Sequence, residues 1–219
     1  MLLTKTSFSI ITVAAVFLLS AQVLLGQRIV DKNKGDHNQT RKGFMDGNLA
    51  ATVYYNFGEV ADWENEPSRS GVWPKGTNHT YLDGVAIIVQ AEAMDPSGNL
   101  IHPLETNYYE FTRYDPSTQV TYGWWPLPGY SDPFSNSPAR SDDKSTWPST
   151  WPDRPADWNG SWNGFFGKGI FNADVETYFV FDDNEDRQYL LEHNFTPDAD
   201  DPSRGGLGMQ VRARGFQWS

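Results

Sequence analysis

The chain of 219 residues contains no cysteine. A disulfide framework and a thiolate metal site are therefore excluded, so stability has to come from burial or from bound cations. Basic residues are also scarce, with 17 Lys and Arg against 28 Asp and Glu and a net charge of −11. Because binding to phosphates needs clustered Lys and Arg, we expect no nucleic-acid partner, and membrane contact only through an uncleaved leader.

The N-terminal segment has almost no charge. After Lys5 the next charged residue is Arg28, and residues 8–25 are nearly all apolar. A basic start followed by an apolar run is typical of a signal peptide, with cleavage predicted after Gly26 or, as the alternative, after Ala21. The run is also long enough to remain as an uncleaved membrane anchor. The sequence thus predicts a protein that is secreted or displayed at the cell surface.

Sequence signatures of catalysis are missing as well. The four histidines do not have the spacing of a metal or protease motif, and neither a G-x-S-x-G motif nor a phosphate-binding loop occurs. With 28 acidic residues, two carboxylates can always be nominated as an acid/base pair, so their presence does not indicate a hydrolase. The sequence leaves enzymatic activity open and favours a non-catalytic role.

The remaining chain has the pattern of short β-strands. No long helical period occurs between residues 45 and 219, and a turn is predicted at residues 95–99 (DPSGN). The apolar strand 85–93 is predicted to be buried on both faces, with 107–114 as its partner or neighbour. Short strands separated by Gly and Pro favour a mostly β fold, either an antiparallel β-sandwich or an open barrel. The predicted strands are 49–57, 85–93, 107–114, 175–181 and 207–216.

Composition divides the chain into three parts. A signal peptide at 1–26, forming a helix, is followed by a flexible polar lead-in at 27–48 and a β-rich domain at 49–219. Within that domain, residues 122–169 are rich in Trp and Pro, which predicts a long irregular insertion held in place by its own rings. The chain ends at Ser219, directly after a predicted strand, so we expect the domain to be truncated at its C-terminus.

Six tryptophans lie in or beside the irregular insertion. Such rings can stack on sugars while nearby Asp and Asn side chains bond the hydroxyl groups, which would make a glycan-binding platform. The burial preference of Trp instead favours rings that anchor the loop to the sheet. Both interpretations concern Trp124, Trp125, Trp147, Trp151, Trp158 and Trp162.

Two acidic turns could bind a hard cation. Alternating oxygen side chains in the first turn match the spacing with which calcium loops surround their ion, although Arg187 and His193 stand where an EF-hand requires Gly and Glu. An EF-hand is therefore excluded, which leaves a looser calcium site or simply solvated turns. The candidate ligands are Asp182, Asn184, Asp186, Asp198 and Asp200.

Four segments carry a resemblance to other proteins: WPSTWPDRP at 147–155, WNGSWNGFFGKG at 158–169, NADVETYFVFDD at 172–183 and GLGMQVRARGFQWS at 206–219. Their Trp/Pro/Gly pattern resembles the N-terminal region of large uncharacterised secreted proteins of Bacteroidetes-type and related Gram-negative bacteria. The resemblance implies a β-rich surface chain, often continued by fibronectin-like modules and a C-terminal secretion sorting domain. It implies no activity that can be assigned to a residue.

Two functions remain. The first is a secreted or cell-surface, non-catalytic β-rich module with a structural or adhesive role. The alternative is a carbohydrate-binding module, or an accessory part of a polysaccharide-degrading enzyme. The partners expected are glycans or other cell-surface components, and calcium is the only cofactor that the residues suggest.

Overall fold

The computed structural model describes residues 33–108, 113–115 and 120–219. The predicted signal peptide at 1–26 lies outside the described residues. Residues 33–219 form one compact unit. Strands dominate its regular structure and helices are few, as the sequence predicts. Within the described ranges, no helix is both long and apolar enough to cross a bilayer.

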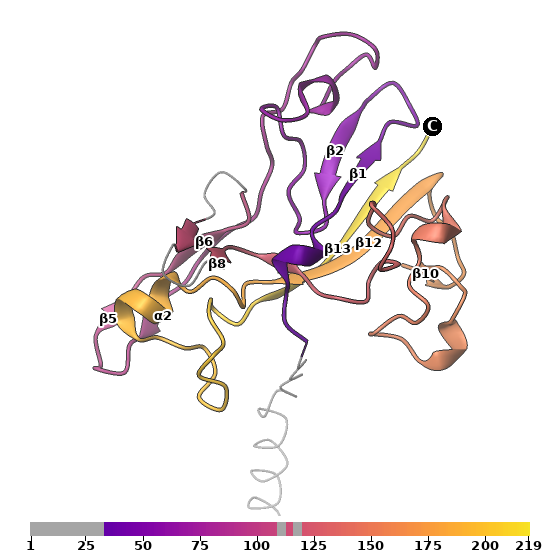
Figure 1. The fold of residues 1–219 in the computed structure, drawn as a ribbon. Coiled ribbons are helices and arrows are strands. Elements are labelled where there is room, and N and C mark those ends of the chain that lie inside the picture. The colour runs from indigo at the N-terminus through magenta and orange to yellow at the C-terminus, as the bar shows by residue number, and fades with distance from the viewer. Residues whose placement is uncertain (1–32, 109–112, 116–119) are drawn as a thin grey trace, which may run out of the picture. The chain divides into compact units, whose positions relative to one another are not determined.

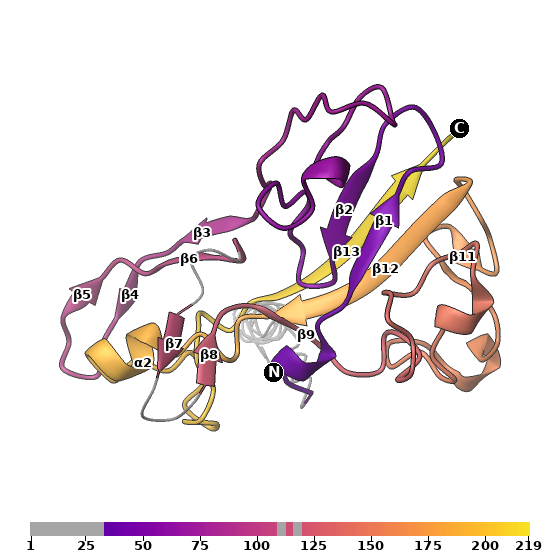
Figure 2. The same ribbon diagram turned by 45° about the horizontal axis from the view of Figure 1, so that its top comes forward.

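The main sheet is built on one long buried strand. Strand β12 (Val175–Asp182) pairs antiparallel with β13 (Gln210–Gln217), from Val175 opposite Gln217 to Asp182 opposite Gln210. The other edge of β12 pairs with the short β9 (Trp125–Pro126). Seven of the eight residues of β12 are buried, because its β-branched and aromatic side chains are packed on both faces. Figures 1 and 2 show β12 and β13 running side by side.

A second, two-stranded sheet packs against this one. Strand β1 (Lys42–Met45) pairs with β2 (Thr52–Tyr55), and both lie alongside the β12–β13 pair in Figure 2. The Tyr54 ring stacks on the Phe179 ring at 6.2 Å between centroids, and Met45 packs on the same apolar cluster. These contacts bury part of the core between the two sheets.

The residues before β1 are not a flexible lead-in in their described part. The Gly35 N–H donates to Asp182 Oδ1 at 3.0 Å, and the Asp36 N–H donates to the Pro126 carbonyl at 3.0 Å. Asp36 also caps the short 3-10 helix η1 (His37–Gln39). Composition indicated a tail, but these hydrogen bonds tie residues 33–41 to the main sheet. The rest of the predicted lead-in, residues 27–32, lies outside the description.

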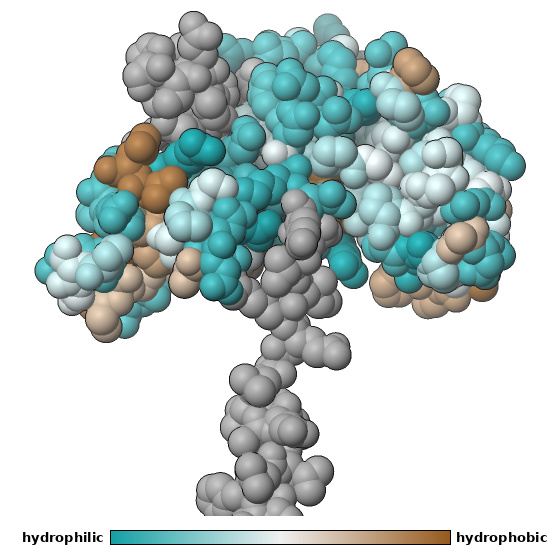
Figure 3. All heavy atoms as spheres, turned by 60° about the horizontal axis from the view of Figure 1, so that its bottom comes forward, coloured by the Kyte–Doolittle hydropathy of each residue, from teal (hydrophilic) through white to brown (hydrophobic). Residues whose placement is uncertain are grey.

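A narrow ribbon extends from residue 87 to residue 107. Strand β3 pairs with β6, and β4 pairs with β5 across the predicted turn, where the Asp95 N–H donates to the Asn99 carbonyl at 2.9 Å. The prediction that 85–93 is buried on both faces is wrong: Ile88 is 69% exposed, because the ribbon is only two strands wide there. Figure 3 shows exposed apolar atoms on this ribbon in brown. Its strands are β3 (Ile88–Gln90), β4 (Ala93–Met94), β5 (Leu100–Ile101) and β6 (Leu104–Thr106).

The predicted partner strand at 107–114 is replaced by β6, and residues 109–112 of that prediction lie outside the description. A further antiparallel pair follows the ribbon, and a short helix occurs at each of two other places. These elements are β7 (Arg113–Asp115), β8 (Val120–Tyr122), η2 (Pro67–Arg69) and α2 (Gln188–His193).

The Trp/Pro-rich insertion is irregular between β9 and β10. From residue 127 to 162 the chain forms 3-10 turns and isolated bridges but no strand of two or more residues. Its prolines remove backbone donors, and its rings supply the packing instead. The elements here are η4 (Lys144–Thr146), η5 (Ala156–Trp158), and the hairpin of β10 (Asn163–Gly164) with β11 (Gly167–Lys168).

Candidate functional site

Four of the six candidate tryptophans face the interior. Trp124, Trp125, Trp151 and Trp162 are each at most 2% exposed. The Trp162 indole N–H donates to Glu176 Oε2 at 2.8 Å, and that of Trp151 donates to the Ser161 carbonyl at 2.9 Å. These rings therefore have no free face for a sugar, and the platform interpretation fails for them.

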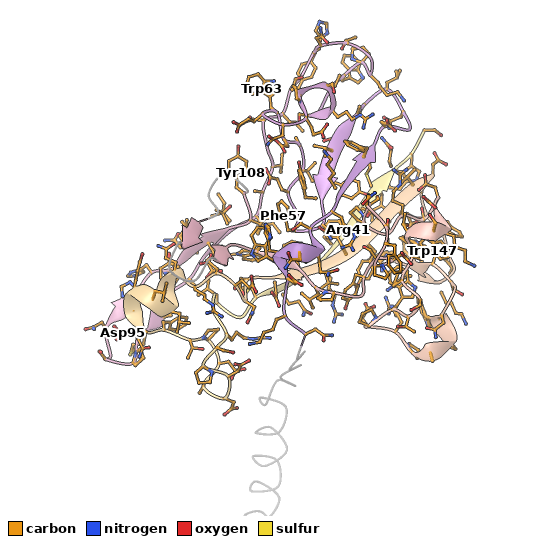
Figure 4. The ribbon with its side chains drawn as sticks, viewed as in Figure 1. Arg41, Phe57, Trp63, Asp95, Tyr108 and Trp147 are labelled. Atoms are coloured by element: carbon orange, nitrogen blue, oxygen red, sulfur yellow. The ribbon has the colours of Figure 1, made fainter. Side chains whose placement is uncertain are left out.

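The other two tryptophans, Trp147 and Trp158, are partly buried against the apolar cluster that contains Trp151 and Trp162. The Trp147 ring lies 5.6 Å from the Trp162 ring, and its N–H donates to the Arg140 carbonyl at 2.5 Å. Figure 4 shows Trp147 among the irregular loops that follow β9. The Arg154 guanidinium covers the Trp158 ring at 4.5 Å from its centroid. These rings thus anchor the loop, which is the second of the two interpretations. Their burial stabilises a segment that forms few backbone hydrogen bonds of its own.

The five candidate calcium ligands do not converge on one position. Asp182 Oδ1 accepts from the N–H groups of Gly35 and Asn184, and Asp198 Oδ1 accepts from that of Asp200 at 2.9 Å. Asp200 is exposed, whereas Asp182 and Asn184 are buried. Among the described residues, no group of three or more His, Asp or Glu side chains is arranged to hold a metal ion. The alternating oxygen side chains of the sequence therefore mark the place where the buried strand β12 ends and a turn begins, and not a cation site.

A buried acidic pair lies next to this turn. Glu105 of β6 is 2% exposed and Asp183 is 1% exposed. The Asp183 carboxylate accepts from the Leu207 and Met209 N–H groups at 2.8 and 2.9 Å, whereas no described residue donates to either oxygen of Glu105. Burial, with the charges of Asp183 and Asp186 added to it, raises the pKa of Glu105. Burial raises the pKa of Asp183 as well, but the Met209 and Leu207 N–H groups oppose that rise. Glu105 has no such donors among the described residues, so it is the carboxyl of the pair that is favoured to keep the proton.

A groove of about 360 Å³ beside β13 brings charged and aromatic side chains together at the surface. Strand alternation places Arg212, Arg214 and Phe216 on one face of β13, and the loop residues Asp153 and Arg154 line the opposite side. The Tyr178 ring and Phe165, at the tip of the β10–β11 hairpin, complete the lining. We call this surface the β13 groove.

Asn163 holds two of the arginines in fixed positions. Its side-chain oxygen accepts from Arg154 Nε at 2.9 Å and from Arg214 at 3.1 Å, and its carbonyl accepts from Arg214 at 2.6 Å. The Arg214 guanidinium also lies 4.0 Å from the centroid of the Tyr178 ring. Burial, followed by weaker effects that include the charge of Arg154, lowers the pKa of Arg214. Two cations are thus packed close together on a rigid support.

Aromatic rings continue the groove outward. Phe165 is 63% exposed and Phe166 is 61% exposed, and the Phe165 ring meets Phe216 edge-on at 6.3 Å. Phe216 in turn stacks on Trp218, which is 55% exposed. Phe165 and Phe216 therefore line the groove, and Phe166 and Trp218 extend the exposed aromatic surface beyond it, an arrangement typical of a binding surface.

Sequence reasoning did not find this groove, although a signal was present. Residues 212, 214, 216 and 218 read Arg, Arg, Phe, Trp at the period of a strand, so the first three share one face of β13 and Trp218 follows directly after its end. The contributions of Asn163 and Arg154 come from a distant loop, and only the fold brings them to this face.

The chain matches no family model, no curated protein and no solved structure.

Proposed function

We propose that this chain is an exported, non-catalytic β-rich module with an adhesive role, and that the β13 groove is its contact surface. The observation that carries the proposal is the gathering of exposed rings and arginines at one groove. A contiguous patch of apolar rings exposed to water is uncommon in soluble proteins and marks an interaction site, and the arginines beside it supply polar contacts for a partner. Tyr, Trp, Phe and Arg are also the residues most enriched at binding sites.

Adhesion is favoured over catalysis by the chemistry of the groove. Its single carboxylate, Asp153, accepts hydrogen bonds from the Tyr178 hydroxyl at 2.6 Å and from the Asn163 amide at 3.1 Å. A glycosidase needs two carboxylates facing each other across the substrate, and the lining of this groove supplies one. Our alternative, a carbohydrate-binding module, is supported by the rings of the groove and no longer by the six loop tryptophans.

Two finer expectations belong to the same proposal. The packing of β1–β2 on β12–β13 supports an antiparallel sandwich or open barrel as the fold. Export through the N-terminal leader, and the resemblance to large secreted bacterial proteins, support a location at the cell surface or outside the cell. Cell fractionation with N-terminal sequencing tests this: recovery of an intact leader in the cytosol would contradict it.

Binding is tested by pull-down of the exported chain on insoluble polysaccharides and cell envelopes. Replacing both hairpin-tip rings, Phe165→Ser with Phe166→Ser, should reduce retention because both side chains are largely exposed, Phe165 lines the groove and Phe166 contacts the Phe165 ring. Phe134→Ser is the matched control, since Phe134 is 92% exposed and does not line the β13 groove. Equal retention of all three proteins, or release of reducing sugar from a polysaccharide, would contradict an adhesive role for this groove.

A further inference from the structure

The charge of the β13 groove is opposite to that of the chain. The chain carries a net charge of −11, yet three arginines and one carboxylate line this groove. The carboxylate, Asp153, approaches the Arg154 Nε no closer than 4.0 Å and is bonded to Tyr178 and Asn163 instead. The groove therefore has an excess of positive charge that its own residues do not neutralise.

The hydrogen-bond donors of the three arginines are used unequally. Both terminal nitrogens of Arg214 donate to Asn163, so this side chain is a fixed part of the wall. Arg154 donates through Nε alone, and its two terminal nitrogens have no hydrogen-bond partner among the described residues. Arg212, which is exposed, has no hydrogen bond or ion pair within that same part of the chain. Two guanidinium groups thus present unused donors to the groove.

Unused guanidinium donors select the shape of an anion. The planar fork of Arg matches the two oxygens of a carboxylate, or two oxygens of a sulfate, through parallel N–H···O bonds. The support of Arg154 by Asn163 and by the Trp158 ring fixes its orientation before a ligand arrives. The arrangement favours a ligand whose oxyanion can accept from these guanidinium groups.

The rings beside the arginines indicate what carries that anion. Phe165 and Phe216 meet at nearly a right angle, with an interplanar angle of 84°, so they form an apolar corner at the rim. A sugar ring offers such a corner its C–H face while its substituents remain free for polar contacts. A simple inorganic anion would make no use of these rings.

We propose that the β13 groove binds an anionic glycan, with Arg154 and Arg212 holding a carboxylate or sulfate of the sugar and with Phe165 and Phe216 contacting its ring. This inference rests on the adhesive function proposed above and specifies its ligand. Nucleic acids and acidic polypeptides share the anion but lack the pyranose ring, so they serve as comparisons in the test.

The test measures binding of the exported chain to matched pairs of polymers. Polygalacturonate is compared with its fully methyl-esterified form, and dextran sulfate with dextran; polyglutamate and single-stranded DNA are the anionic polymers without a pyranose. We expect at least one charged glycan to bind at least about tenfold more tightly than its neutral partner, as losing one charge-assisted contact predicts. The pair that responds distinguishes a carboxylate from a sulfate.

Variants locate the binding at the groove. Arg212→Gln removes an exposed side chain with no partner in the described structure, so folding should be unchanged and affinity for the charged glycan should fall about tenfold. Lys144→Gln is the control, because Lys144 is also exposed and lies outside the groove. An equal loss in both variants would mean that binding is nonspecific attraction, which would overturn the inference.

The remaining outcomes distinguish failure of the anionic-glycan inference from failure of the proposed adhesive function. Equal affinity for charged and neutral glycans, with retention still lost in the Phe165 and Phe166 variant, would overturn the anionic ligand and leave adhesion standing. Binding of polyglutamate or DNA as tight as that of the best glycan would remove the sugar from the proposal. If none of the glycans binds, the inference fails, and absence of retention on cell envelopes as well would remove the adhesive function.

Discussion

Single side chains in this protein have roles that depend on burial. Trp162 is fully buried, and its indole N–H supplies one of the hydrogen bonds of Glu176, whose other oxygen accepts from the Asn172 and Ala173 N–H groups. Burying a carboxylate is tolerated only when its oxygens are bonded in this way. Trp162 therefore both buries apolar area and donates a hydrogen bond to a buried carboxylate, and neither role leaves it available to a ligand.

Replacement of Trp162 should lower the free energy of unfolding more than replacement of an exposed ring does. We expect Trp162→Ala to lower the free energy of unfolding by about 3–5 kcal/mol, and Trp162→Phe by about 1–3 kcal/mol through loss of the hydrogen bond to Glu176. Phe134→Ala should change it by less than about 0.5 kcal/mol, because Phe134 is 92% exposed. Urea denaturation measures all three, and a Trp162→Ala protein as stable as Phe134→Ala would contradict the anchoring role.

Glu105 should make the protein less stable as the pH rises. Its folded-state pKa is raised above the ordinary value of 4.5, chiefly by burial, so the folded chain keeps a proton that the unfolded chain releases above that pH. Stability is then lost as the pH rises above about 4.5, by up to about 1.4 kcal/mol per pH unit. Glu105→Gln carries no such proton, so its unfolding free energy should decline less steeply between about pH 5 and about pH 8. The exposed Glu64→Gln should keep the wild-type slope, and an equally steep slope in Glu105→Gln would disprove the assignment.

At the scale of elements, the β10–β11 hairpin links the fold to the groove. Its two tip residues, Phe165 and Phe166, are exposed, while Asn163 at its base holds Arg154 and Arg214. One short hairpin therefore positions both the rings and the cations. We thus expect a small shift of its backbone to change the groove.

A methyl group at Gly164 should cause such a shift. A Cβ there would overlap the carbonyl oxygens of Ile170 and Gly167, and backbone atoms cannot move aside as a flexible side chain can. We expect Gly164→Ala to cost about 1–3 kcal/mol of stability and to weaken retention on the ligand polymer. Gly160→Ala, where a Cβ meets no atom within 4 Å but φ is +71°, should cost about 1 kcal/mol and leave retention unchanged. Pull-down of both variants decides between them, and unchanged binding by Gly164→Ala would separate the hairpin from the site.

Sequence patterns predicted those elements whose local signal agrees with their surroundings. Residues 175–181 alternate β-branched and aromatic side chains and form most of β12, and the residues of 95–99 form the predicted turn. The same reasoning misjudged 85–93, since an apolar run records hydrophobicity but not whether another layer covers it. It also missed Glu105, which is affected by Asp183, and Asn163, which holds Arg214, because both partners lie far away in the chain.

At the scale of the whole molecule, the question is what replaces covalent crosslinks. The chain has no cysteine, and two apolar clusters stabilise the fold in place of disulfides. One cluster packs the loop tryptophans on Tyr178 and Val180, and the other packs Tyr54 and Trp124 on Phe179 and Phe181. Both use β12, which presents one set of side chains to each cluster. The single strand thus connects the irregular loop with the β1–β2 sheet.

Because burial suffices in this arrangement, removing divalent cations should not change thermal stability. The carboxylates of Asp182, Asp183 and Asp198 already accept backbone N–H groups, which supply the polar contacts that a calcium ion would otherwise provide. A ligand that binds only the folded state must raise the melting temperature, so calcium bound at the acidic turns would reveal itself. We expect the same melting temperature in EDTA as in calcium chloride at matched ionic strength, measured by calorimetry on the exported chain. A lower melting temperature in EDTA that calcium restores would reinstate the cation site at these turns, and with it the view that bound cations replace crosslinks here.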